Sequence, residues 1–188
     1  MTVESWVAAE LSSLRQRLQG GFVNAVPADR WRETVDGGGV PALYVAWHTA
    51  RHHDLCVNVI LRGTSEVLDG WRDRVGISGD TWRGLAEAQD HELIEQLDPA
   101  VVGQYLLAVL DESIRWLGTA DLADLDAVPD SAAALASIGT PTDRFDWLYD
   151  LWQGKPRQFF LSWEAVGHGY NHLGELISLR NRLGLSPF

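Results

Sequence analysis

The sequence predicts an all-α protein, and three observations support this fold class. Apolar residues recur at three- and four-residue steps in four long segments, as on the buried face of a helix. Proline and glycine stand near the ends of these segments. No segment alternates apolar and polar residues with the β-branched enrichment of a strand. With 46% hydrophobic residues in 188, the chain can build one core, so we expect a single domain over 1–188.

Each of the four predicted helices has its own start and stop signals. The first is expected to stop at Gly20 and Gly21, because consecutive glycines typically end a helix. The second opens at Pro41 and the third at Asp98, an N-cap residue followed by a first-turn proline. The predicted helices span, in chain order, residues 3–19, 41–62, 98–118 and 155–184.

The connectors between these helices are expected to be irregular. A tryptophan-rich stretch over 69–97 has room for a short helix around 85–92. The segment 119–146 is acidic and rich in alanine, and we expect a long loop with a helical turn at 132–136. Several of the nine tryptophans lie in connectors, where they could cover a pocket.

Two histidines four residues apart mark the last predicted helix. At about 3.6 residues per turn, His168 and His172 project from one face. That face is the apolar one, since both fall in register with a stripe of core residues: Leu161, Ala165, Leu176, Leu179 and Leu183. A buried imidazole needs hydrogen-bond partners or a metal ion for its nitrogens. The pair therefore indicates either a metal site or hydrogen-bonded core histidines.

The second predicted helix offers a partner for this pair. His48 and His52 lie on its inward stripe, whereas His53 is rotated by roughly 140° and is expected to be solvated. If this helix packs beside the last one, three or four imidazoles converge. We predict that His48, His168 and His172 bind a metal ion, and that His52 is a fourth ligand, an outer-shell group or a boundary residue.

The number of ligands separates two kinds of site. Three imidazoles leave a position for water or substrate, as in catalytic zinc sites, whereas four close the shell around a structural ion. Zinc and nickel both suit imidazole. An ion with an open position would activate a bound water or thiol at neutral pH.

Further residues near the histidines are candidates for supporting roles. Glu175 and Asp54 could be outer-shell acceptors or bases, with exposed helical carboxylates as the alternative. Trp47, Tyr170 and Asn171 are candidates to line the cavity, with ordinary packing as the alternative. No residue is assigned a catalytic role. The single cysteine, Cys56, is expected to fill the core.

Composition excludes several partners. The formal charge of −11 and the single lysine argue against nucleic acid, which requires clustered cations. No apolar run approaches the roughly 18 residues of a membrane span, and the N-terminus lacks a signal-peptide pattern. We expect a cytoplasmic protein that acts on a small molecule. Spare apolar helix faces favour a homodimer.

The chain resembles the DinB-like superfamily of bacterial four-helix proteins. The superfamily includes the bacillithiol and mycothiol transferases and the N-terminal domain of maleylpyruvate isomerase. The matching segments are 26–31 (VPADRW), 45–51 (VAWHTAR), 166–175 (VGHGYNHLGE) and 179–180 (LR). Members often carry Glu or Gln at the position of His53, and the connector 119–146 is not part of the short signature.

The resemblance implies an up-down-down-up, DinB/YfiT-like four-helix bundle. By position, its metal triad corresponds to His48, His168 and His172. It also implies a divalent ion, often zinc or nickel, frequent dimers, and transfer of a low-molecular-weight thiol onto an electrophile.

Three hypotheses follow from the sequence. The first is a metal-dependent thiol S-transferase or related hydrolase. The second is a non-catalytic metal-binding or stress-related protein whose ion only holds the helices together. The third is a metal-free protein with hydrogen-bonded histidines.

Overall fold

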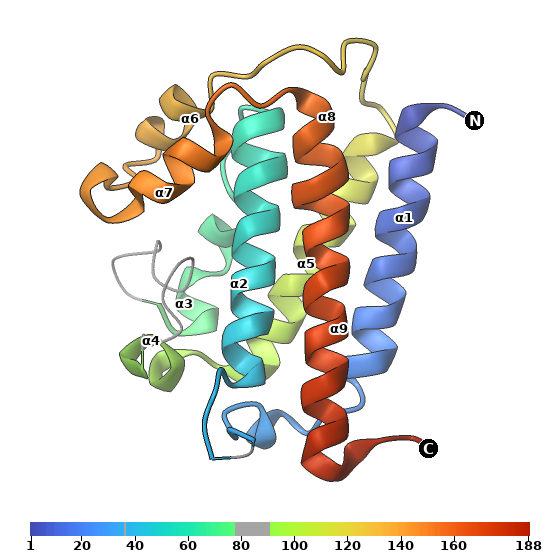
Figure 1. The fold of residues 1–188 in the computed structure, drawn as a ribbon, viewed down its shortest axis with the longest axis vertical. Helices are drawn as coiled ribbons and strands as arrows, with labels where there is room; N and C mark the ends of the chain where they lie inside the picture. Colours follow the sequence, from blue (N-terminus) through green and yellow to red (C-terminus); the bar gives the residue numbers. More distant parts are fainter. Residues whose placement is uncertain (36, 78–90) are drawn as a thin grey trace.

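The computed structural model describes residues 1–35, 37–77 and 91–188, and this part of the chain is mostly helical and contains no strand (Figure 1). The predicted all-α class is confirmed. The α-helices are α1 (Val3–Leu18), α2 (Ala42–Asp54), α3 (Arg72–Val75), α4 (His91–Gln96), α5 (Pro99–Leu117), α6 (Ser131–Ser137), α7 (Thr142–Trp152), α8 (Arg157–Phe159) and α9 (His168–Arg180). Short 3₁₀ turns are η2 (Ala28–Arg30) and η4 (Val67–Gly70), and π-helical segments are η1 (Gln19–Val23), η3 (Leu55–Leu61), η5 (Phe160–Gly167) and η6 (Asn181–Leu185).

Four long helical segments lie side by side and enclose the core. They are α1 with η1, α2 with η3, α5, and the continuous run from α8 through η5 and α9 to η6. Helices α1 and α2 each pack against both α5 and α9. In Figure 1, α1 and α9 run downwards while α2 and α5 run upwards. Because α2 and α9 are neighbours, side chains on their facing stripes meet.

Helix α1 does not stop at its two glycines, contrary to the sequence prediction. The chain continues through Gly20 and Gly21 as the π-helical segment η1, which ends at Val23. A Cβ on Gly21 would lie 3.6 Å from the side chain of Ile177 in α9. These glycines therefore lie within a helical stretch whose packing against α9 outweighs their low helix propensity.

The segment after α5 holds more helix than predicted. Helix α6 confirms the helical turn expected at 132–136, but α7 begins at Thr142, so the expected loop over 119–146 is wrong at its C-terminal end. Helix α7 is kinked at Phe145. The expected short helix around 85–92 falls almost entirely on residues outside the described ones. Within those described, α4 begins at His91.

A buried polar network joins α2 to α5 and to the turn η4. The carboxylate of Asp54 accepts hydrogen bonds from the backbone nitrogens of Val67 and Leu68, at 2.9 and 3.0 Å, and from the Tyr105 hydroxyl at 2.6 Å. The guanidinium of Arg51 lies 2.5 Å from the carboxylate of Glu66. Burial alone would lower the pKa of Arg51. Glu66, Tyr105 and Asp54 together raise it by more, so its pKa lies above the ordinary value and the side chain stays charged. The network fixes the side of α2 that faces α5 and η4.

Candidate metal centre

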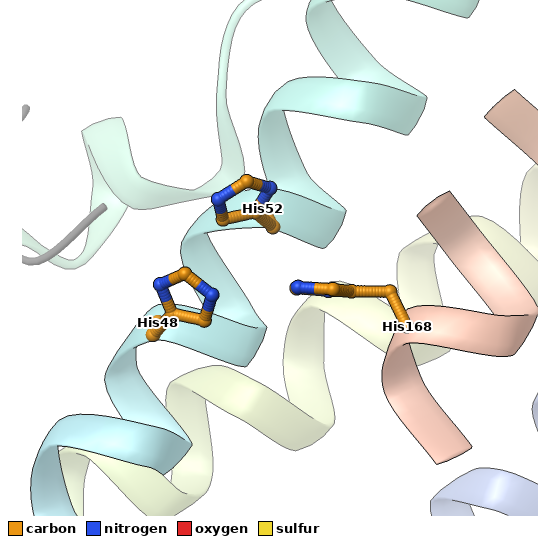
Figure 2. A group of neighbouring side chains, drawn as sticks. All are labelled: His48, His52 and His168. Atoms are coloured by element: carbon orange, nitrogen blue, oxygen red, sulfur yellow. The ribbon is translucent and has the colours of Figure 1, made fainter. Parts of the chain in front are cut away.

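Four imidazoles from α2 and α9 meet inside the molecule. The ring of His48 lies 4.4 Å from that of His52, 5.2 Å from that of His168 and 4.9 Å from that of His172, measured between centroids. Figure 2 shows His48 and His52 on consecutive turns of α2, with His168 reaching towards them from α9. The predicted convergence of histidines from two separate parts of the chain is therefore present.

Three of these rings form one group of possible metal ligands. One nitrogen from each of His48, His52 and His168 lies within 4.8 Å of the others. His52 is buried, whereas His48 and His168 are partly exposed. Nitrogens bound to one tetrahedral ion lie about 3.3 Å apart for metal–nitrogen bonds of about 2.0–2.1 Å, so these atoms would have to approach one another by at most about 1.5 Å.

His172 adjoins this group through His168. Their Nε2 atoms lie 3.0 Å apart, and the Nδ1 atom of His172 lies 2.9 Å from a carboxylate oxygen of Glu175. A carboxylate accepts but does not donate, so this contact places the proton of His172 on Nδ1 and leaves a lone pair on Nε2. The arrangement matches the pattern in which a carboxylate orients a metal-binding histidine.

His52 is buried without a hydrogen bond. Its side chain is 4% exposed, and neither Nδ1 nor Nε2 has a hydrogen-bond partner among the described residues. Each unsatisfied buried nitrogen costs roughly 1–3 kcal/mol. The nearest charged group is Glu164 of η5, whose Oε2 atom lies 3.5 Å from Nδ1 of His52. A metal ion coordinated by His52 would satisfy one of these nitrogens.

The electrostatics of the cluster favour a neutral imidazole at His168. Burial is the main factor that lowers the pKa of His168, and the neighbouring rings of His52, His172 and His48 lower it further, to about 2. In its neutral form, His168 offers a lone pair from one of its two ring nitrogens. Neutral imidazoles are the form that binds divalent metals.

His53 is not solvated, contrary to the sequence prediction. It is only 3% exposed, its Nε2 lies 2.9 Å from the hydroxyl of Ser113 in α5, and the Ala165 carbonyl also bonds to the ring. The prediction assumed that α2 has one buried face. Because α5 covers a second face of α2, His53 is buried there, away from the four rings of the site.

The remaining candidates occupy different surroundings. The carboxylate of Asp54 accepts hydrogen bonds from backbone nitrogens of η4 and from the Tyr105 hydroxyl of α5. Trp47 is fully buried and packs against Tyr105, with ring centroids 5.7 Å apart. The hydroxyl of Tyr170 lies 3.4 Å from Glu10 of α1, and Asn171 is exposed. Glu175 is in hydrogen-bond contact with a site histidine, His172.

Glu164 and its tryptophan partner, Trp152, were not among the residues predicted for the site. The side chain of Glu164 is 1% exposed, and its Oε1 atom accepts a hydrogen bond of 2.9 Å from Nε1 of Trp152. A signal was available: Glu164, His168 and His172 follow one another at four-residue steps. No comparable signal marks Trp152, because its contact depends on how α7 folds back over α2.

The backbone changes its winding beside the site. The π-helical segment η5 ends directly before His168, and η3 begins directly after Asp54. Such segments are rare in proteins and occur frequently at functional sites. Here the wider turn of η5 lies between Glu164 and His168, so it helps set their relative direction.

The cysteine is a core residue, as expected. Cys56 is buried, and its Sγ atom lies 3.3 Å from the backbone carbonyl of Phe160. Burial, with a contribution from Glu164, raises the pKa of its thiol well above the ordinary value. A thiol that resists ionisation is a poor nucleophile, so Cys56 is not a candidate for covalent chemistry.

The donor set fits a borderline transition metal. A set of imidazole ligands matches zinc, nickel or copper better than magnesium or calcium, which prefer oxygen ligands. Within the described residues, no helix is both long and apolar enough to cross a membrane.

Comparison with family models and with curated proteins gives no match. Among solved structures, the chain is similar to a conserved protein from Enterococcus faecalis. The TM-score is 0.68 at 17% sequence identity, and the alignment covers 98% of this chain and 99% of the other. At this identity the likeness shows a shared helical fold over the whole length of both proteins.

Proposed function

We propose that this protein is a DinB-like, divalent-metal-dependent enzyme with the up-down-down-up four-helix arrangement of that superfamily. His48, His168 and His172 would hold the ion, and the reaction would be transfer of a low-molecular-weight thiol or hydrolysis. The observation that supports the proposal best is the pair of Nε2 atoms of His168 and His172, 3.0 Å apart beside the ring of His48. Two lone pairs at this distance repel each other unless a proton or an ion lies between them.

The residues of the chain have separate tasks in this proposal. Glu175 keeps the Nε2 lone pair of His172 available, and burial keeps His168 neutral. Trp147 and Trp152 of α7 lie beside His52, with ring centroids 6.0 and 6.1 Å away, and shield the inner side of the site from water. A bound zinc or nickel ion would lower the pKa of a coordinated water or thiol and so provide a nucleophile at neutral pH.

The proposal is tested by metal analysis combined with kinetics. Protein purified without chelator should contain close to one equivalent of zinc or nickel, and should conjugate a small thiol to a model electrophile faster than the uncatalysed reaction. His168→Ala should lose both properties. Asn171→Ala, an exposed change on the same helix, should keep both. Metal-free wild-type protein, or equal turnover by His168→Ala, would contradict the proposal.

A structural ion is the second candidate, and the orphaned nitrogens of His52 favour it. With His52 as a fourth ligand, the shell of a tetrahedral ion would be closed. In that case His52→Ala should weaken metal binding about as much as His48→Ala, and no thiol should bind the cobalt-substituted protein. With an open site, His52→Ala should weaken metal binding less than His48→Ala does, and a simple thiol such as 2-mercaptoethanol should give a new sulfur-to-cobalt absorption band.

We further propose that the protein is a homodimer. The exposed indoles of Trp6 in α1 and Trp163 in η5, which are 41% and 45% exposed, support this proposal. Sedimentation equilibrium should give twice the mass of one chain. Trp163→Glu should give the mass of a single chain.

A further inference from the structure

Glu164 is a buried carboxylate whose two oxygens have different surroundings. Oε1 accepts the hydrogen bond from Nε1 of Trp152, at 2.9 Å. Oε2 has no hydrogen-bond partner within the described part of the chain, and its ion-pair contact is with Nδ1 of His52, at 3.5 Å. Both side chains are almost completely buried, at 1% and 4% exposed. One acceptor and one ring nitrogen, both unsatisfied, thus face each other beside the histidine cluster.

A carboxylate in such a place requires compensation. Removing an ionised carboxylate from water costs several kcal/mol unless hydrogen bonds and a positive charge offset the loss. One hydrogen bond from an indole does not suffice. A hydrogen bond from Nδ1 of His52 needs the two atoms to approach by only about 0.5 Å, to the usual distance of about 2.9–3.0 Å. A divalent ion among the histidines would supply the positive charge.

We infer that Glu164 is a positioning residue, which holds His52 with its Nδ1 proton towards Oε2 and so leaves the Nε2 lone pair for the ion or for a group bound to it. This inference rests on the proposed metal site. It makes Glu164 and His52 a second carboxylate–histidine pair, equivalent to Glu175 and His172. The first pair lies in the interior, and the second is partly exposed, with 42% exposure at Glu175.

The same geometry makes the segment after α5 a part of the site. Trp152 is the last residue of α7, and its backbone carbonyl accepts a hydrogen bond of 3.0 Å from the hydroxyl of Ser131 in α6. Its ring is buried and meets Phe160 edge-on, with centroids 5.7 Å apart. Trp152 thus fixes Glu164, and Glu164 fixes His52. The connection from α6 and α7 to the ion passes through these side chains.

The test is a double-mutant cycle on the full chain, with cobalt(II) as the probe. Affinity is measured by competition with a chelator, and coordination by the visible absorption of bound cobalt. Glu164→Gln keeps the size of the side chain and its acceptor for Trp152 but removes the charge. It should weaken cobalt binding about 10- to 100-fold, the usual effect of losing such a carboxylate, and shift the visible bands.

In a His52→Ala background, Glu164→Gln should cause no further loss, because its effect passes through His52. Trp152→Phe, which removes only the indole donor, should shift the bands in the same direction by less. Asp150→Asn, an exposed change on α7, is the matched control and should leave affinity and spectrum unchanged.

Each outcome bears on a different claim. Unchanged affinity and spectrum in Glu164→Gln overturn the inference while leaving the metal site intact. An equal loss in both backgrounds also overturns it, since Glu164 would then act independently of His52. If Glu164→Gln does not fold, Trp152→Phe decides by the same criteria. Wild-type protein that binds no cobalt overturns the proposed function, and the inference with it.

Discussion

At the scale of single residues, neighbouring histidines differ because their partners differ. His52 and His53 are adjacent in the chain and equally buried, at 3% exposed. His53 is hydrogen-bonded to Ser113 and to the carbonyl of Ala165, whereas His52 has no hydrogen bond among the described residues. A fully satisfied imidazole is a packing residue, and an unsatisfied one beside three other rings is a candidate for metal chemistry.

The lowered pKa of His53 predicts how the free energy of unfolding changes with pH. Burial is the main cause that lowers its pKa, from 6.5 to about 4, so the folded protein resists a proton that the unfolded chain accepts. Its contribution is therefore complete above pH 6.5 and is lost as the pH falls towards 4, by up to about 3 kcal/mol. In His53→Gln the glutamine side chain has no proton to gain over this pH range. In chelator-treated protein, its unfolding free energy from urea titrations should fall less steeply over this range than that of wild type; parallel curves would contradict the prediction.

At the scale of elements, two left-handed glycines test how tightly α3 meets α4 and α5. Gly76 ends α3 with φ of 90°, and a Cβ there would lie 2.2 Å from the backbone oxygen of Gln96. The backbone nitrogen of Asp98 donates a hydrogen bond of 3.0 Å to the carbonyl of Val75. The end of α3 and the start of α5 therefore cannot move apart without breaking this bond. Gly63 has φ of 63° and no atom within 4 Å of such a Cβ.

These surroundings predict different effects for the same substitution. Gly63→Ala should cost only the left-handed backbone penalty, about 1–2 kcal/mol of unfolding free energy. Gly76→Ala adds a backbone clash and should cost at least about 2 kcal/mol more. Chemical denaturation of both variants measures the difference. Equal losses would show that the junction of α3 with α4 relaxes without strain.

At the scale of the whole molecule, the proposed ion connects α2 with α9, which are distant in the chain. A ligand that binds only the folded state raises stability by mass action, by about 2.7 kcal/mol at a free concentration 100 times its Kd. We therefore expect zinc or nickel to raise the melting temperature, and a chelator to lower it. His48→Ala should melt at the same temperature with metal or chelator. A metal-induced rise that persists in His48→Ala would place the ion elsewhere.

The amino-acid pattern by itself determined the all-α class, the main extent of the long helices, and the inward position of His48, His52, His168 and His172. Such features depend on local periodicity, which fixes the direction of each side chain relative to its own helix. The pattern also contained Glu164, four residues before His168.

The tertiary structure alone decided which helix faces meet. It buried His53 against α5, extended α1 through two glycines, and brought Trp152 of α7 to Glu164. These outcomes depend on contacts between residues far apart in the chain, whose free energy is not encoded in the periodicity of either segment. For this reason the histidines could be assigned to one interior from the sequence, whereas the partners that distinguish them could not.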